Sequence, residues 1–166
     1  GGRSHPELTA AVAASLGTEI APVEHRTFAS CEIYARFEVS IRGCDAFIIQ
    51  SFGPPVNEWL MELLIMLDAA KRASAKRITV VAPYYPYSRQ DKKGRGREPI
   101  SARLVADLLK TAGADRVMSV DLHAAQIQGF FDGPVDHLFA KPVLLEYFQR
   151  TLSPEDREKL TVVSPD

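Results

Sequence analysis

The fold is decided by Ile78-Thr-Val-Val-Ala82 and the segment that follows it, Pro83-Tyr-Tyr-Pro-Tyr-Ser-Arg-Gln-Asp-Lys-Lys-Gly-Arg-Gly-Arg-Glu-Pro99. The first run is short, apolar and rich in β-branched residues, which predicts a buried strand. A helical pattern begins near Ser101. A strand, a loop and a helix in this order are the repeating unit of an α/β fold, in which ligands bind beyond the carboxyl ends of the strands.

The loop between this strand and this helix carries a local positive charge. Its five cations are Arg89, Lys92, Lys93, Arg95 and Arg97, and its two anions are Asp91 and Glu98. The whole chain is balanced, with 20 Lys and Arg against 21 Asp and Glu. A cationic loop at the tip of a strand suits a polyanionic ligand, and Arg89 and Gln90 at its start are candidates for holding a triphosphate. The alternative is a solvated loop whose charges serve solubility.

The rest of the chain alternates strands and helices every 30 to 40 residues. Strands are predicted over residues 23–28, 32–39, 46–50, 77–82, 116–120 and 160–163. Helices are predicted over residues 6–16, 56–75, 101–112 and 142–150, with a further one capped by Ser153. This alternation predicts a single doubly wound α/β domain, with a mostly parallel sheet and helices on both faces.

Two more strand ends carry polar chemistry. Asp121-Leu-His123 follows one strand, and Asp166 follows the last. In an extended segment, Asp121 and His123 would point to the same side, where an imidazole and a carboxylate suit a divalent metal that bridges phosphate oxygens. The alternative is a structural histidine paired with an aspartate. Three polar strand ends from distant parts of the chain together favour phosphate chemistry.

Composition argues against several other classes of protein. A net charge of −1 disfavours a nucleic-acid binder driven by its overall field, and no apolar run approaches the roughly 20 residues that span a bilayer. The start of the chain lacks the features of a signal peptide. Cys31 and Cys44 have no metal-ligand spacing and are expected to be reduced thiols. We therefore expect a cytoplasmic protein without nucleic-acid or membrane partners.

Taken together, the motifs resemble the amino-terminal half of the ribose-phosphate diphosphokinase family, also called phosphoribosyl diphosphate synthases. The resemblance covers essentially the whole chain, and its segment from Asp121 to Asp132 is highly specific. The matching blocks are Arg42-Gly-Cys-Asp45, Asn57-x-x-Leu-Met-Glu-Leu63, Tyr87-Ser-Arg-Gln-Asp-Lys-Lys93, Pro99-Ile-Ser101, Val120-Asp-Leu-His123, Gln126-Ile-Gln-Gly-Phe-Phe-Asp132 and Val163-Ser-Pro-Asp166.

The resemblance implies a type I phosphoribosyltransferase-like fold and a Mg²⁺-dependent transfer of the diphosphoryl group of ATP to ribose 5-phosphate, which gives phosphoribosyl diphosphate and AMP. It also implies a homo-oligomer, a hexamer in such enzymes. The residues that it assigns to ATP are Arg89, Gln90, Phe28, Ser30 and Glu32, the last three in a turn that contacts adenine across a subunit interface. Without the resemblance, the residues of this segment predict only a hairpin turn with a phenylalanine in the core. The resemblance assigns His123 and Asp166 to the metal, and no catalytic residue to this chain.

The chain also departs from the family's pattern. The adenine turn usually carries Asp or Asn followed by Gly, where this chain has Ser30-Cys31, and Cys31 lacks the freedom of glycine at positive φ. The carboxyl-terminal domain that binds ribose 5-phosphate has no counterpart here. Residues 1–166 are therefore expected to be the ATP- and metal-binding domain of a longer enzyme, inert by themselves. The alternative is a non-catalytic regulatory subunit that assembles with active synthases.

Overall fold

The computed structural model describes residues 1–163 and contains two sheets. The main sheet is parallel, with the strand order β3-β4-β5-β6. Its strands are β3 (Asp45–Ile49), β4 (Arg77–Val81), β5 (Arg116–Val120) and β6 (Val135–Leu138). The second sheet is an antiparallel hairpin of β1 (Val23–Thr27) and β2 (Ile33–Phe37).

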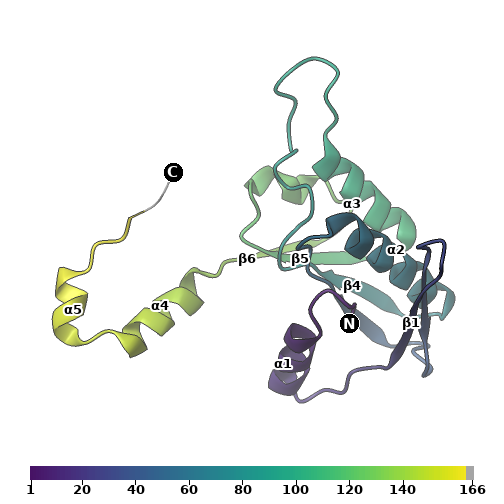
Figure 1. Cartoon of the computed structure of the whole chain (residues 1–166), viewed down its shortest axis with the longest axis horizontal. Helices are drawn as coiled ribbons and strands as arrows, with labels where there is room; N and C mark the ends of the chain where they lie inside the picture. The colour runs from purple at the N-terminus through teal and green to yellow at the C-terminus, as the bar shows by residue number, and fades with distance from the viewer. Residues whose placement is uncertain (164–166) are drawn as a thin grey trace.

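Residues 1–163 form five α-helices, of which the second and third pack against the parallel sheet (Figure 1). They are α1 (Pro6–Leu16), α2 (Val56–Arg72), α3 (Ser101–Ala112), α4 (Lys141–Thr151) and α5 (Pro154–Lys159), with a 3₁₀ turn η1 (Ala125–Gly129). The core between α2, α3 and the sheet includes Leu63, Leu67 and Val80, all fully buried. Leu63 and Leu67 lie four residues apart on α2, as the apolar spacing predicts for a core-facing helix. The predicted α/β fold with a parallel sheet is confirmed.

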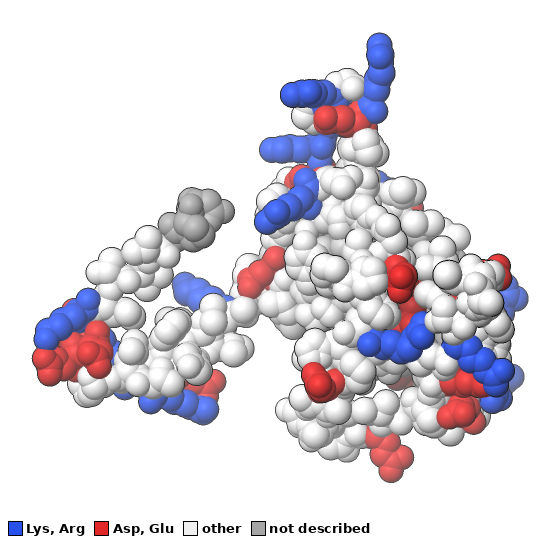
Figure 2. Space-filling view, in the orientation of Figure 1, with Lys and Arg blue, Asp and Glu red and all other residues white. Residues whose placement is uncertain are grey.

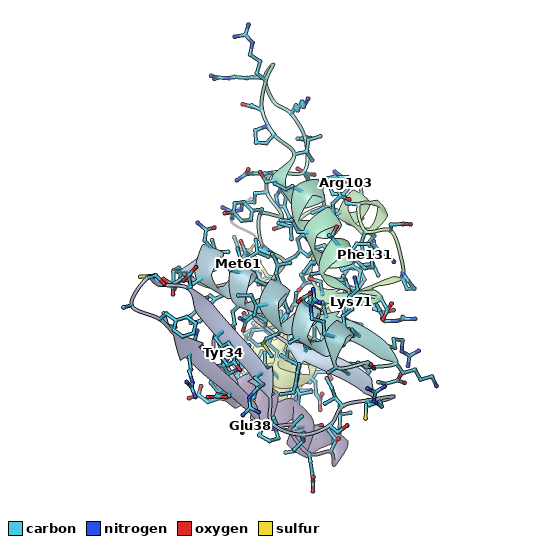
Figure 3. The ribbon with its side chains drawn as sticks, turned by 90° about the vertical axis from the view of Figure 1, so that its right-hand side faces the viewer. Tyr34, Glu38, Met61, Lys71, Arg103 and Phe131 are labelled. Carbon is cyan, nitrogen blue, oxygen red and sulfur yellow. The ribbon has the colours of Figure 1, made fainter. Side chains whose placement is uncertain are left out.

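The β1–β2 hairpin lies against α2 rather than extending the main sheet. Figure 3 shows this hairpin, with Tyr34 and Glu38 labelled, alongside the helix that carries Met61. Ala35 of β2 is buried in the same core as α2. No backbone hydrogen bond of the described ladders joins the hairpin to the parallel sheet. The position of the hairpin therefore depends on side-chain packing and on the chain at its two ends.

Two predicted features of the carboxyl-terminal part were wrong. Residues 160–163 do not form a strand, because Leu160, Val162 and Val163 are exposed and pair with no strand of the described chain. Conversely, β6 forms at residues 135–138, where no strand was predicted. This strand pairs in parallel with β5, and its Asp136 carboxylate accepts hydrogen bonds from Arg116 at 2.8 and 3.0 Å.

The last two helices project away from the body of the molecule (Figure 1). None of their residues is buried. The predicted cap of the last helix is confirmed, because the Ser153 hydroxyl accepts a hydrogen bond from the Asp156 backbone N–H at 3.1 Å. Among residues 1–163, no helix is both long and apolar enough to cross a bilayer.

Candidate functional site: the carboxyl ends of β4 and β5

The sheet brings two of the predicted polar strand ends together. The strands β4 and β5 are parallel neighbours, so their carboxyl ends lie side by side. The pairing continues beyond the strands, because the Ala82 N–H donates to the Met118 carbonyl at 2.8 Å and the Val120 N–H donates to the Pro83 carbonyl at 3.0 Å. The cationic loop therefore starts directly beside Asp121.

Tyrosines anchor the first part of this loop. The buried Tyr85 hydroxyl donates to the Ala102 carbonyl of α3 at 3.1 Å. Burial raises the pKa of Tyr85, so the phenol stays neutral and remains a donor. The Tyr87 hydroxyl donates to the Asn57 side chain of α2. These contacts hold the start of the loop between α2 and α3.

Gln90 is fixed at the amino terminus of α3. Its side-chain oxygen accepts a hydrogen bond from the Ser101 hydroxyl at 2.5 Å, and its backbone carbonyl accepts one from the Ala102 N–H at 3.1 Å. Ser101 is the first residue of α3, and Ile100 occupies the cap position. Arg89 and Gln90 are both exposed. An exposed arginine beside the amino terminus of a helix forms a setting for phosphate oxygens.

The cations of the loop are free to meet a ligand. Within residues 1–163, none of the five forms an ion pair. The two anions are already engaged: Glu98 accepts from the Gly94 and Arg95 N–H groups at 2.8 and 2.9 Å, and Asp91 accepts from Gln126 at 2.8 Å. Figure 2 shows the lysines and arginines at the end of the projecting loop.

The Asp91–Gln126 contact ties the cationic loop to the segment after β5. Asp91 is buried, although it lies in a loop of exposed cations. Its carboxylate meets a side chain from η1, 35 residues further along the chain. The sequence indicated no role for Asp91 beyond its charge. Its position four residues after Tyr87 belongs to no apolar periodicity that would predict burial. This hydrogen bond fixes Arg89 and Gln90 relative to the predicted metal ligand His123.

Asp121 and His123 are both exposed at the end of β5. Asp121 has a φ of 46°, so the segment is not extended and the alternation expected for Asp121 and His123 does not apply. The Asp121 carboxylate accepts one hydrogen bond, from the Ala140 N–H at 3.2 Å. The expected structural pairing of these two residues is absent from the described hydrogen bonds, and His137 instead accepts from the Leu122 N–H at 2.9 Å.

The donor set at this strand end suits a shared metal. Among residues 1–163, no cluster of three or more His, Cys, Asp or Glu side chains could hold an ion alone. Mg²⁺ usually takes one or two protein ligands and completes its octahedron with phosphate oxygens and water. The exposed Asp121 carboxylate therefore suits a metal that arrives with a phosphorylated ligand, and the exposed His123 imidazole lies two residues further along at the same strand end. Asp166, the other predicted metal ligand, lies outside the described residues.

The predicted adenine turn lies on the β1–β2 hairpin. Phe28 and Glu32 are exposed, and their backbone closes the turn with a Phe28 N–H to Glu32 carbonyl hydrogen bond of 2.9 Å. The Ser30 hydroxyl donates to the Glu32 carboxylate at 2.7 Å. Cys31 has a φ of 66°, so this cysteine keeps the left-handed conformation that glycine adopts more easily.

This turn does not meet the rest of the site within the chain. No described hydrogen bond or ion pair links Phe28, Ser30 or Glu32 to Arg89, Gln90 or His123 in residues 1–163. In Figure 3 the hairpin lies along the lower left, whereas the cationic loop rises above Arg103. The structure thus groups Arg89, Gln90 and His123 at one sheet edge and leaves the turn on a separate surface.

A buried carboxylate behind the hairpin was missed by the sequence analysis. Glu62 of α2 is fully buried, and its Oε2 accepts from the Arg3 guanidinium at 2.6 Å. Its Oε1 accepts from the Arg3 N–H at 2.7 Å and from the Gln50 side chain at 3.1 Å. His25 of β1 lies 3.8 Å away from Oε2, with a buried Nδ1 that has no hydrogen-bond partner. The sequence did contain an indication of this buried carboxylate, since Glu62 is the one acid inside the apolar run Leu60-Met-Glu-Leu-Leu64.

Stability is expected to fall in acid because of His25. Burial lowers the pKa of His25 below its ordinary value of 6.5; the nearby Glu62 carboxylate opposes this shift, and Arg3 adds to it. The folded chain thus binds a proton at His25 less readily than the unfolded chain. The contribution of His25 to the free energy of unfolding is therefore lost as the pH falls below about 6.5. Urea unfolding at pH 7.5 and pH 5.5 measures the loss. His25→Phe should make the loss smaller, and an unchanged difference between the two pH values would refute the assignment.

Comparisons with known proteins show which family the chain resembles along its length. A family model described as the N-terminal domain of ribose phosphate pyrophosphokinase matches residues 1–113. A ribose-phosphate pyrophosphokinase of Corynebacterium efficiens is 62% identical over 165 residues, which are 99% of this chain and 50% of that protein. One of Mycobacterium tuberculosis is 61% identical over the same length.

A solved structure is similar as well. The crystal structure of phosphoribosylpyrophosphate synthetase from Mycobacterium smegmatis matches with a TM-score of 0.87 and 63% identity, over 90% of this chain and 50% of that one. The chain thus spans about half the length of the relatives that it matches.

Proposed function

Because the chain belongs to the ribose-phosphate pyrophosphokinase family, we propose that it is the ATP- and metal-binding amino-terminal domain of an enzyme that transfers the diphosphoryl group of ATP to ribose 5-phosphate. Pyrophosphokinase and diphosphokinase are two names for this activity. The carboxyl-terminal domain that holds ribose 5-phosphate belongs to the rest of such an enzyme. The observation that carries the proposal is the unpaired Arg89 beside Gln90 and His123 at adjoining strand ends.

Each residue has a separate part in this proposal. Arg89 binds phosphate oxygens of ATP with its planar guanidinium, and Gln90 supports it from the end of α3. His123 would hold Mg²⁺ at the ATP phosphates, and Asp166 would hold the metal that serves ribose 5-phosphate. Mg²⁺ supplies charge neutralisation of the transferred group. The chain's own side chains position ATP and stabilise developing charge, and no protein nucleophile is needed.

The adenine turn is proposed to serve a neighbouring subunit. Phe28, Ser30 and Glu32 are exposed on a hairpin that shares no backbone ladder with the parallel sheet. A homo-oligomer, a hexamer by the resemblance, would place this turn against the nucleotide of another copy. Cys31 keeps the left-handed backbone of the turn, which favours a working adenine site over a purely regulatory subunit. We propose a cytoplasmic enzyme with ATP and ribose 5-phosphate as its ligands.

The identity of the nucleotide product tests this function. The full-length protein, incubated with Mg²⁺, ATP and ribose 5-phosphate, is expected to give AMP and phosphoribosyl diphosphate in equal amounts, observed by ³¹P NMR. Omitting ribose 5-phosphate should stop AMP formation. Formation of ADP would show transfer of a single phosphoryl group and contradict the proposal. Saturable Mg-ATP binding without any product would instead favour the regulatory subunit.

A further inference from the structure

Glu62 occupies an unusual place for a carboxylate. It lies on the buried face of α2 and contacts three separate parts of the chain: Arg3 in the amino-terminal segment, Gln50 after β3, and His25 on β1. Such a charge is stable only when it is paired and hydrogen-bonded, and removing one partner leaves the others uncompensated. Each of its two oxygens accepts at least one hydrogen bond. The carboxylate therefore fixes these three segments relative to α2.

Arg3 extends this network to the end of β1. While its Nε donates to Glu62, its Nη1 donates to the Thr27 hydroxyl at 3.2 Å. Thr27 is the last residue of β1 and directly precedes Phe28. His25 and Thr27 are two residues apart on a strand, so both side chains point to the same side, toward α2. The network therefore ends at the residue immediately before the Phe28–Glu32 turn.

We propose that Glu62 is a positioning residue that acts through Arg3 and Thr27 to hold the Phe28–Glu32 turn in its ATP-binding orientation. The proposal rests on the proposed function of that turn. The hairpin shares no backbone ladder with the parallel sheet, so its orientation depends on side chains. Apolar packing, such as that of Ala35, resists separation of the hairpin from α2 but is not directional. Short charge-assisted hydrogen bonds are directional, so they fix the orientation of the hairpin that a binding turn needs.

Two isosteric variants of the full-length protein test the proposal. In Glu62→Gln, an amide N–H₂ faces the donors of Arg3 and Gln50, so the network is broken without a change of shape. The KM for ATP is expected to rise about tenfold, because misplacing a binding group weakens ligand contacts. The KM for ribose 5-phosphate and kcat should stay within twofold. Thr27→Val removes only the exposed hydroxyl and should raise the KM for ATP by about threefold.

Asp68→Asn is the matched control, since this acid lies on the same helix and pairs with Arg72 on the surface. It should leave all three constants unchanged. In the double variant Glu62→Gln/Thr27→Val, the KM for ATP should equal that of Glu62→Gln alone, because both changes break one chain of contacts. Parallel changes in kcat and both KM values would indicate a general structural role and overturn the proposal, as would an unchanged KM for ATP in Glu62→Gln.

Amide hydrogen exchange separates this proposal from the proposed function. In Glu62→Gln, the amides of residues 27–33 are expected to exchange faster, while those of β4 and β5 keep their protection. This readout needs no activity. If the full-length protein makes no product, the proposed function fails, yet faster exchange confined to the turn still supports Glu62 as its positioning residue. Unchanged exchange in residues 27–33 refutes the positioning role even in an active enzyme.

Discussion

Replacing Arg89 with alanine in the full-length protein is expected to lower kcat/KM by about two orders of magnitude. This corresponds to roughly 3 kcal/mol of transition-state stabilisation, the amount lost when other preorganised electrostatic donors are removed. The physical reason is that Arg89 is exposed, unpaired and held beside the amino terminus of α3 by the neighbouring Gln90.

Steady-state kinetics with ATP as the varied substrate measures this loss. Arg103→Ala provides the control, because Arg103 is also exposed near the start of α3 but is paired with Asp107 at 2.9 Å. The control should retain kcat/KM within twofold. Turnover of Arg89→Ala within threefold of the parent would reject the proposed role of this arginine.

The largest expected effect on stability comes from Leu67→Ala. Leu67 has no exposed surface and packs between α2 and the parallel sheet. Truncating a buried leucine removes apolar contacts and leaves a cavity, which costs about 2–5 kcal/mol in well-packed cores. We expect the free energy of unfolding of the chain to fall by about 3 kcal/mol.

Urea unfolding followed by circular dichroism measures this change. Leu104→Ala on α3 is the matched control, since that leucine is 57% exposed, and it should change the free energy of unfolding by less than about 1 kcal/mol. Equal losses in the two variants would show that the core is not where the structure places it.

The main architecture could be predicted because apolar periodicity determines which faces are buried. The strand before the cationic loop, the helix α2 and the helix after the loop all formed as expected. The errors lie where strand formation depends on a partner. Residues 161–163 are β-branched but find no neighbouring strand in the described chain, whereas β6, with two polar residues, pairs along β5. Periodicity alone does not contain this information.

The site was predicted less completely than the fold. Arg89, Gln90 and His123 lie at adjoining strand ends because parallel strands bring their carboxyl ends together. The positive φ of Asp121 changed the orientation expected from alternation. The contacts of Glu62 with Arg3 and of Asp91 with Gln126 join residues 59 and 35 positions apart. Such long-range contacts have no local signature. The prediction for Asp166 stays a prediction, because that residue lies outside the described part of the chain.

The central claim is that Mg²⁺-bound ATP lies where the ends of β4 and β5 meet. A crystal structure of the full-length protein with Mn²⁺ and a non-hydrolysable ATP analogue tests it most directly, since Mn²⁺ is visible by its anomalous signal. We expect an anomalous peak next to the His123 imidazole and the triphosphate in contact with Arg89. A nucleotide bound at another surface, with neither His123 nor Arg89 in contact with it, would contradict the account.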